Sequence, residues 1–172
     1  MKKRAILIVS AVLLFVIALC AVGKLLFTQR IDQQVEAAVY RDGETVGTTT
    51  VSMRGKKTRY PFLENSFVGE FCVPWVEETD VDGLQAKIEW NNDHHVQTIR
   101  YSYRGELLGV NERGIAYFLL IGDGMEEFAL MTTQGDVIAT SPEAYRLCAG
   151  HISTDGGSRS SVDDIDGIPA LN

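Results

Sequence analysis

The stretch EETDVDGLQAKIE, residues 77–89, spaces acidic side chains in the way that a calcium-binding loop does. The residues that match the oxygen donors and the turn glycine of an EF-hand are Glu78, Asp80, Asp82, Gly83 and Glu89. An EF-hand also needs a helix on each side of this loop. Pro74 precedes the loop, and the residues after Gly83 alternate between apolar and polar, as a strand does. We therefore expect an acidic turn that leads into a strand, and no calcium site.

Two other groups of residues have the chemistry of metal ligands. His94 and His95 are adjacent, and neighbouring side chains of an extended segment point to opposite faces, so the two imidazoles cannot easily share one ion. No third ligand can be assigned, which favours two loop histidines. A fragment of the calcium pattern recurs near the C-terminus at Asp164, Asp166 and Gly167. The sequence thus predicts no metal and no other cofactor.

The sequence contains no recognisable catalytic motif. It has no G-x-S-x-G, no H-E-x-x-H and no phosphate-binding loop, and its spacing groups no nucleophile with a histidine and an acid. No residue is therefore predicted to be catalytic, and a non-enzymatic role is favoured. The alternative is an anchored or secreted hydrolase whose active-site residues converge only in the fold.

Candidate binding residues also have structural interpretations. Side chains that could stack on sugar rings are Trp75, Trp90, Tyr101, Tyr103 and Tyr117, although aromatics that alternate along strands usually lie in a core. The basic segment RGKKTR, residues 54–59, is expected to be a turn that could contact an anionic wall polymer. Cys72 and Cys148 are expected either to form a disulfide in an oxidising compartment or to remain two buried thiols.

The N-terminal segment has the composition of a membrane anchor. Residues 1–4 form a basic tip with Lys2, Lys3 and Arg4, and residues 5–27 are almost entirely apolar. A helix of that length extends about 34 Å, enough to cross a bilayer core of about 30 Å. The basic tip orients the N-terminus to the cytoplasm and the rest of the chain to the outside. We therefore predict a single-pass signal anchor in the cell membrane.

Processing of this anchor has two alternatives. Ala21 and Gly23 are small residues compatible with signal-peptide cleavage, although the apolar run is longer than the usual h-region. Cys20 would permit lipidation, but Leu19 occupies the place where a small residue is needed. A retained anchor is the interpretation that we favour.

The charge of the chain excludes one class of partner. Residues 29–172 hold 12 of the 16 Lys and Arg and all 23 Asp and Glu, a net charge of 12 − 23 = −11. A domain of this charge repels phosphate backbones and, taken as a whole, anionic lipid head groups. Nucleic acid is therefore not an expected partner. The partners that remain are the membrane itself and a protein or polysaccharide of the cell envelope.

Residues 28–38 place Ile31 and Val35 four residues apart among good helix formers, which predicts a short helical juxtamembrane stalk. Asp42-Gly43 then predicts a two-residue type I′ hairpin, with Arg41 and Glu44 as a cross-strand ion pair. Alternating or apolar runs predict further strands within residues 48–53, 66–73, 84–90, 96–103, 115–121, 127–133 and 137–140.

The C-terminal part of the chain predicts one helix and a tail. Ser141 suits an N-cap, Pro142 the first helical position and Gly150 a stop, so residues 142–149 are expected to be helical. The tail, residues 151–172, is rich in Gly, Ser and Asp and is expected to be flexible and acidic.

The stretch YPFLENSFVGEF, residues 60–71, joins an aromatic and apolar pair to an acidic or amide turn and a strand with Phe, Gly and Phe. It resembles a pattern of small single-pass, membrane-anchored proteins of Gram-positive bacteria that carry an extracytoplasmic β domain and have no assigned activity. The resemblance implies a location in the cell envelope, and it implies no activity and no functional residue.

Together these patterns predict a mainly β protein. An N-terminal transmembrane helix is followed by one antiparallel β-sheet or sandwich domain, residues 39–150, with a short C-terminal helix. The expected role of this extracytoplasmic domain is binding or assembly at the cell envelope.

Overall fold

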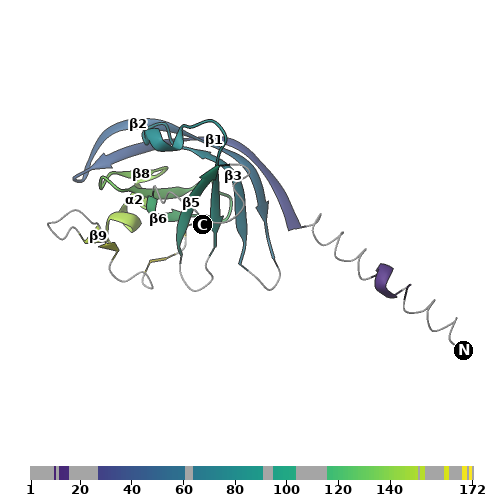
Figure 1. Cartoon of the computed structure of the whole chain (residues 1–172). Helices are drawn as coiled ribbons and strands as arrows, with labels where there is room; N and C mark the ends of the chain where they lie inside the picture. The colour runs from purple at the N-terminus through teal and green to yellow at the C-terminus, as the bar shows by residue number, and fades with distance from the viewer. Residues whose placement is uncertain are drawn as a thin grey trace, which may run out of the picture.

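The computed structural model describes residues 10, 12–15, 27–60, 64–90, 95–103, 116–150, 152–153, 161–162, 168–169 and 171. Figure 1 shows a curved wall of strands with a short helix packed beside it. The strands of this wall are β1 (Thr28–Arg41), β2 (Glu44–Thr58), β3 (Ser66–Cys72), β4 (Leu84–Glu89), β5 (Val96–Tyr103), β6 (Ala116–Ile121), β7 (Phe128–Thr132) and β8 (Val137–Ala139). The remaining elements are the 3₁₀ helix η1 (Glu77–Thr79), the helix α2 (Pro142–Ala149) and the paired short strands β9 (Ile152–Ser153) and β10 (Ser161–Val162).

Strands β1–β8 form one closed antiparallel barrel in which each strand pairs with the next strand of the chain. β1 closes the barrel by pairing with β8, from Ala38 opposite Ala139 to Tyr40 opposite Val137. The prediction of a mainly β domain with a short C-terminal helix is confirmed. The expected sheet or sandwich is a closed barrel, and closure leaves β1 and β8 without a free edge where they pair.

The predicted helical stalk at residues 28–38 is wrong, because these residues form most of β1. Ile31 and Val35 are four residues apart, a spacing that fits one face of a helix and equally one face of a strand. In the barrel Ile31 belongs to the inner core, as do Ala37 and Val39, and the partly buried Val35 packs against it. The β domain therefore begins at Thr28, eleven residues before the predicted boundary at residue 39.

The predicted basic turn at residues 54–59 is also wrong, because all but its last residue continue β2. β2 pairs with β3 in unbroken register, from Ser52 opposite Cys72 to Thr58 opposite Ser66. The basic side chains therefore alternate between the two faces of the barrel wall.

Lys57 is the member of this segment that points into the barrel, where its side chain is 1% exposed. Its Nζ lies 4.5 Å from the ring centroid of Trp90 and donates hydrogen bonds to the backbone carbonyl and to Oδ1 of Asp123. Arg59 binds the other carboxylate oxygen of Asp123 at 2.6 Å. The hydrogen bond from Lys57 lowers the pKa of Asp123, so an ionised carboxylate neutralises the buried lysine. These contacts cover the barrel end at which β1 begins.

The barrel interior is filled by side chains, as is usual for eight strands. β3, β4 and β5 alternate as predicted, and their inward residues include Phe67, Phe71, Ala86, Ile88 and Ile99. Tyr101 is buried with them, and its hydroxyl donates a hydrogen bond to the backbone carbonyl of Phe71 at 3.0 Å. The described inward side chains form one continuous hydrophobic core.

Strands β6–β8 are apolar on both faces, as the sequence predicts for β6. Their outer faces form a second cluster with α2, to which Ala144 and Cys148 contribute. Ile168 and Leu171 are buried in the same cluster, so the end of the tail packs on the barrel. The expectation of a flexible tail over residues 151–172 is therefore wrong for its end.

Two local predictions are confirmed. Asp42 and Gly43 have φ angles of 50° and 88°, and Arg41 lies opposite Glu44, as a type I′ hairpin requires. Helix α2 spans the predicted residues, and the Ser141 hydroxyl caps it by accepting a hydrogen bond from the backbone N–H of Ala144 at 3.1 Å.

The predicted membrane span at residues 5–27 lies almost entirely outside the described residues. Those of its residues that are described, 10, 12–15 and 27, are helical. Within the part of the chain that the structure describes, no helix is long and apolar enough to cross a membrane. The anchor thus stays a prediction.

Candidate functional site

Asp136, Arg41 and Trp75 meet at the end of the barrel opposite Thr28. Arg41 donates two hydrogen bonds to the Asp136 carboxylate, Nε to Oδ1 and Nη2 to Oδ2, both 2.7 Å long. The indole Nε1 of Trp75 donates a third, to Oδ2, at 3.0 Å. The Asp136 side chain is buried, whereas about half of the Arg41 side chain and 40% of Trp75 are exposed. One buried carboxylate therefore orients two exposed side chains.

Barrel closure brings Arg41 to Asp136. The β1–β8 register runs from Ala38 opposite Ala139 to Tyr40 opposite Val137, and its next step sets Arg41 beside Asp136. The predicted ion pair between Arg41 and Glu44 is wrong for this reason. The two residues are opposite each other, but the guanidinium turns to the more buried carboxylate, with which it makes a bidentate pair.

The connection between β3 and β4 holds Trp75 in place. The Thr79 hydroxyl accepts a hydrogen bond from the backbone N–H of Val73 and lies 2.8 Å from its carbonyl, which ties the middle of the loop to its first residue. The Trp75 ring lies against Gly47 of β2, where a Cβ atom would come within 3.2 Å of the ring. The missing side chain of Gly47 thus lets the indole lie on the barrel wall.

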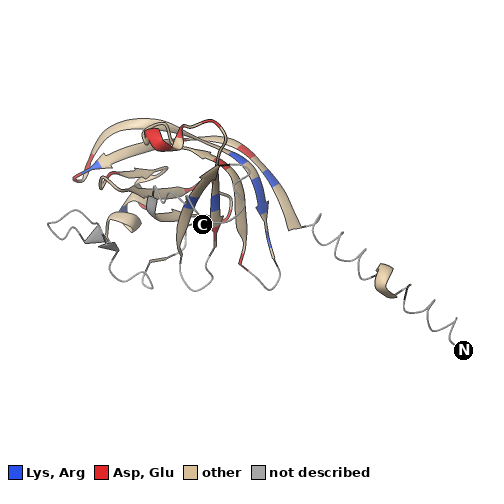
Figure 2. Ribbon diagram, viewed as in Figure 1, with Lys and Arg blue, Asp and Glu red and all other residues tan. Residues whose placement is uncertain are grey.

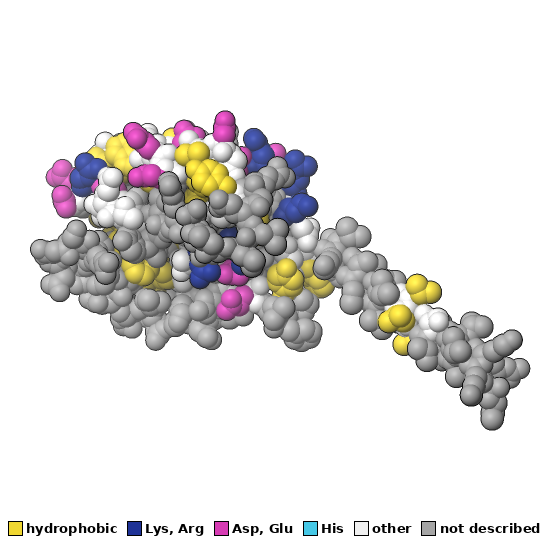
Figure 3. All heavy atoms as spheres, in the orientation of Figure 1, with side chains coloured by type: hydrophobic (Ala, Val, Ile, Leu, Met, Phe, Trp, Pro, Cys, Tyr) yellow, Lys and Arg dark blue, Asp and Glu magenta, His cyan; other side chains and the backbone are white. Residues whose placement is uncertain are grey.

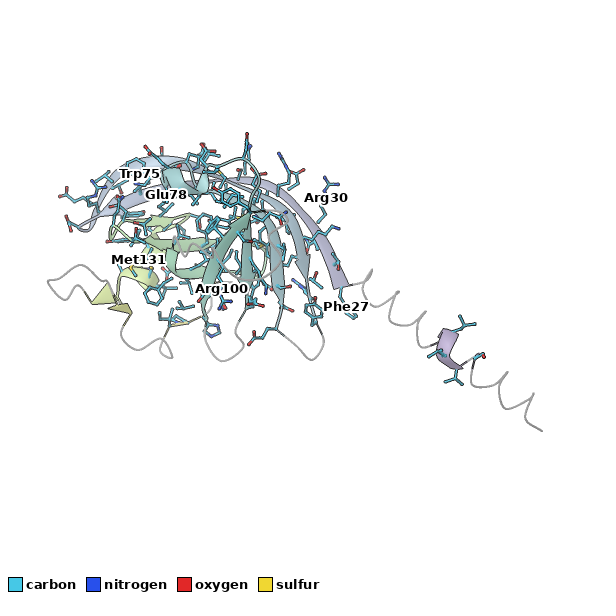
Figure 4. All side chains as sticks on the ribbon, in the orientation of Figure 1. Phe27, Arg30, Trp75, Glu78, Arg100 and Met131 are labelled. Atoms are coloured by element: carbon cyan, nitrogen blue, oxygen red, sulfur yellow. The ribbon has the colours of Figure 1, made fainter. Side chains whose placement is uncertain are left out.

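A pocket of about 370 Å³ opens beside these residues. Figure 4 shows Trp75 and Glu78 over the same part of the barrel, away from Phe27 and Arg30. The residues that line the pocket are Arg41, Trp75, Val76, Glu77, Glu78, Thr132, Thr133, Gln134 and Asp136. Among the described residues, the buried Thr132 hydroxyl has no hydrogen-bond partner. The pocket therefore combines one aromatic ring with charged and neutral hydrogen-bonding groups.

The electrostatic environment of Asp136 does not suit a general acid. The hydrogen bonds from Arg41 hold the pKa of Asp136 below its usual value, and Trp75 acts in the same direction, against the opposing effect of burial. Asp136 is consequently ionised at neutral pH and has no proton to give to a leaving group. Its carboxylate orients Arg41 and Trp75.

The structure separates the aromatic residues that the sequence suggested for sugar stacking. Trp90 and Tyr101 lie in the barrel core. Tyr103 is 40% exposed on β5, and the side chain of Tyr117 lies outside the described residues. Among those of the five whose side chains are described, Trp75 alone lines the pocket described above. Its partners Arg41 and Asp136 are 95 residues apart in the chain, and no local pattern marks them as a pair.

The acidic segment at residues 77–89 is a turn that leads into a strand, as predicted. Glu77–Thr79 form η1, Gly83 has a φ of 81°, and β4 begins at Leu84. Glu89 lies within β4 and pairs with Lys87 at 2.7 Å. The described residues contain no group of three His, Cys, Asp or Glu side chains that could hold a metal ion. His95 is exposed, and His94, Asp164, Asp166 and Gly167 lie outside the described residues.

Cys72 and Cys148 are free thiols, which corresponds to the second of the two sequence interpretations. Burial and a hydrogen bond to Asp80 raise the pKa of Cys72 to about 11. Burial alone raises the pKa of Cys148 to about 11. Both therefore act as small buried side chains and are poor nucleophiles at neutral pH.

Cys72 also lines a second cleft, of about 610 Å³, on the outer wall. This cleft lies where the end of β3 and the start of β4 meet the loop that joins them. Its charged residues have both signs, and Arg54 is already paired with Asp32 and Glu70. This cleft has no exposed aromatic ring.

The fold and the pocket together define the protein as a small, side-chain-filled β-barrel with a surface pocket built around one oriented tryptophan. No protein-family model, curated protein or solved structure matches the chain.

Proposed function

We propose that the protein is a membrane-anchored, extracytoplasmic barrel that binds a polysaccharide of the cell envelope at the Trp75 pocket. The observation that carries this proposal is the state of Trp75, which is exposed although its ring and its N–H are both held in position. An aromatic ring that is already oriented loses little conformational freedom when a flat apolar face stacks on it.

The surrounding groups suit a sugar better than an apolar ligand. A pyranose ring offers one apolar face and several hydroxyl groups. Arg41 can donate hydrogen bonds to such hydroxyls, while Glu78 and Gln134 can accept them. The volume of the pocket is at the lower end of the range of small-molecule sites, as expected for one or two sugar units of a longer chain.

The position of the pocket fits a role at the cell surface. The predicted anchor ends at Phe27, next to the start of β1, whereas Arg41 is the last residue of β1. The strand therefore carries the pocket to the barrel end that lies away from the anchor. An anchored hydrolase is the alternative function, and the ionised state of Asp136 makes this residue unsuitable as its acid.

Binding to polysaccharide tests this function. The full-length protein in detergent is incubated with purified peptidoglycan and with soluble oligomers of N-acetylglucosamine, and retention and tryptophan fluorescence are measured. Trp75→Ala is expected to weaken binding about thirtyfold, because burying an aromatic side chain contributes about 2 kcal/mol. Tyr103→Ala is the matched control, because Tyr103 is equally exposed and lies outside the pocket, and it should bind as the wild type does. Equal retention of wild type and Trp75→Ala would contradict the proposal.

The proposed topology has its own test. Protease added to intact protoplasts should digest the barrel domain, because the Lys2–Arg4 cluster orients the N-terminus to the cytoplasm. Protection of the domain until the cells are lysed would reverse the orientation.

A further inference from the structure

A row of basic residues crosses the outer wall of the barrel near the end at which β1 begins. Its members lie opposite one another in register on five successive strands, and they are Arg30, Lys56, Val68, Lys87 and Arg100. All five side chains are exposed, and Val68 is the one uncharged member. The row thus places four cations on one band of the wall.

Two of the four cations of this row form no ion pair with a described residue. Glu89 lies 2.7 Å from Lys87 and 3.9 Å from Arg100. Arg30 and Lys56 are direct cross-strand neighbours, and no acidic side chain of the described residues is within ion-pair distance of either. Like charges opposite each other destabilise a strand pair. An anionic partner outside the barrel would remove this repulsion.

Exposed aromatic residues lie just beyond the row, at the rim of the same barrel end. Phe27 and Tyr60 are 43% and 42% exposed, and both line a pocket of about 580 Å³ with Arg59. The backbone N–H of Arg59 donates a hydrogen bond to the carbonyl of Phe27 at 2.8 Å, which holds the two chain segments together. Aromatic side chains together with long basic side chains are typical of protein surfaces at a membrane–water interface.

Many acidic residues of the barrel lie at the opposite end, whereas Asp32, Glu70 and Glu89 lie beside the basic side chains. In Figure 2, η1 is red and the β1–β2 turn is red and blue, whereas blue segments lie on the parts of β1 and β2 near Thr28. In Figure 3, the largest group of dark blue side chains lies at the end of the barrel nearer the N-terminal segment, and smaller groups lie elsewhere on the barrel. Although residues 29–172 carry a net charge of −11, the barrel therefore presents a row of four cations next to the end of the predicted anchor.

We propose that this basic row, together with Phe27 and Tyr60 at the rim, forms a surface through which the barrel contacts the head groups of anionic phospholipids. This surface relies on the proposed membrane anchor, because an apolar segment that ends at Phe27 leaves no spacer before β1. Arg30 is three residues further along, about 10 Å at the rise of a strand. That distance is about one Debye length at physiological salt, within which anionic lipids attract basic side chains.

The contact can be measured in the full-length protein reconstituted into nanodiscs. A Cys20→Ser background leaves two buried thiols, and a fluorophore is attached either at Tyr60→Cys or, as the matched control, at Val46→Cys. Val46 is similarly exposed, at 46%, but lies beside the distal hairpin. Quenching by nitroxide-labelled head groups reports contact with the bilayer. Strong quenching at position 60 and little at position 46 is expected in discs that contain phosphatidylglycerol.

Replacing two cations of the row by neutral residues measures how much their charge contributes to the contact. Arg30→Gln with Lys56→Gln should lower the equilibrium constant for contact between the barrel and the bilayer about twenty-fivefold, because each basic residue near an anionic surface contributes about fivefold. Arg146→Gln removes a comparably exposed cation on α2 and should leave quenching unchanged. Cooperative melting at or above the wild-type temperature would show that all variants are folded, because removing the repulsion between Arg30 and Lys56 can only stabilise the strand pair.

Three outcomes would overturn the proposal, and they are distinguishable. Equal quenching at positions 60 and 46 in a protein that resists alkaline carbonate extraction would reject the contact surface alone. Release of the protein by carbonate would reject the anchor, and with it this orientation of the barrel. The double variant could also lose binding to a purified anionic wall polymer while its quenching stays unchanged. That result would show that the basic row binds the polymer and not the phospholipid head groups.

Discussion

Gly55 on β2 and Gly69 on β3 lie directly opposite each other in the barrel wall, so close that a Cβ atom on Gly55 would come within 2.8 Å of the Cα of Gly69. The same Cβ atom would lie 2.5 Å from the backbone carbonyl oxygen of Val68. Glycine pairs of this kind let a barrel wall bend sharply. Here the pair lies one step along the strands from the basic row, between Arg54 and Lys56 of β2.

Replacing Gly55 by alanine is therefore expected to destabilise the barrel. The added methyl group meets backbone atoms, which cannot move aside as a side chain can, and we expect a loss of about 3 kcal/mol in the free energy of unfolding. Gly124→Ala is the matched control, because a Cβ atom there has no atom within 4 Å. Chemical denaturation of both variants checks this, and similar midpoints for the two would contradict the close packing.

The hairpin at Asp42-Gly43 provides a second stability prediction. Gly43 has a φ of 88°, which a β-branched residue adopts poorly, so Gly43→Val should destabilise the protein by about 1 kcal/mol or more. Gly43→Asn should be milder, because asparagine tolerates a left-handed backbone. Thermal unfolding of the two variants is the measurement. A melting temperature of Gly43→Val equal to that of the wild type would mean that the turn is not under this constraint.

Acid should weaken the barrel through Asp136 and Asp123. Both carboxyl groups have a pKa lowered in the fold, by hydrogen bonds from Arg41 and Lys57 respectively. A lowered pKa contributes stability that is complete above the unfolded value, about 3.9 for Asp, and is lost as the pH falls through the folded value. The free energy of unfolding is therefore expected to fall steeply as the pH decreases below about 4.

Substitutions at Asp136 and Arg41 can show how much of this pH dependence comes from their ion pair. Asp136→Asn and Arg41→Gln should each reduce the slope of stability against pH in acid, and the double variant should reduce it no further than Asp136→Asn does. Denaturation at a series of pH values measures the slope. An additive effect of the two substitutions would show that Arg41 and Asp136 act independently.

Calcium is expected not to stabilise the protein. The carboxylates of residues 77–89 are dispersed over η1, a turn and β4, and Glu89 is engaged with Lys87. A site with a dissociation constant near 10 µM would add about 2.7 kcal/mol at 1 mM free ion. Thermal unfolding in calcium chloride and in sodium chloride of equal ionic strength should coincide. A calcium-specific increase of several degrees that Asp82→Asn abolishes would instead establish a site.

Much of the wall of the barrel is determined by local patterns in the sequence. Strict alternation in Leu84–Glu89 sets which side chains face inward, because successive residues of a strand point to opposite sides. The Asp42-Gly43 turn and the Ser141-Pro142 helix start are equally local, since each depends on the backbone preferences of two or three adjacent residues.

Other features were decided by the tertiary structure alone. The spacing of Ile31 and Val35 is compatible with a helix or a strand, and only pairing with β2 and β8 makes Thr28–Arg41 a strand that closes the barrel. Closure, in turn, gives Arg41 a buried carboxylate 95 residues away in place of its exposed neighbour Glu44. The pocket at Trp75 follows from that contact, because long-range register, which no local pattern encodes, brings its groups together.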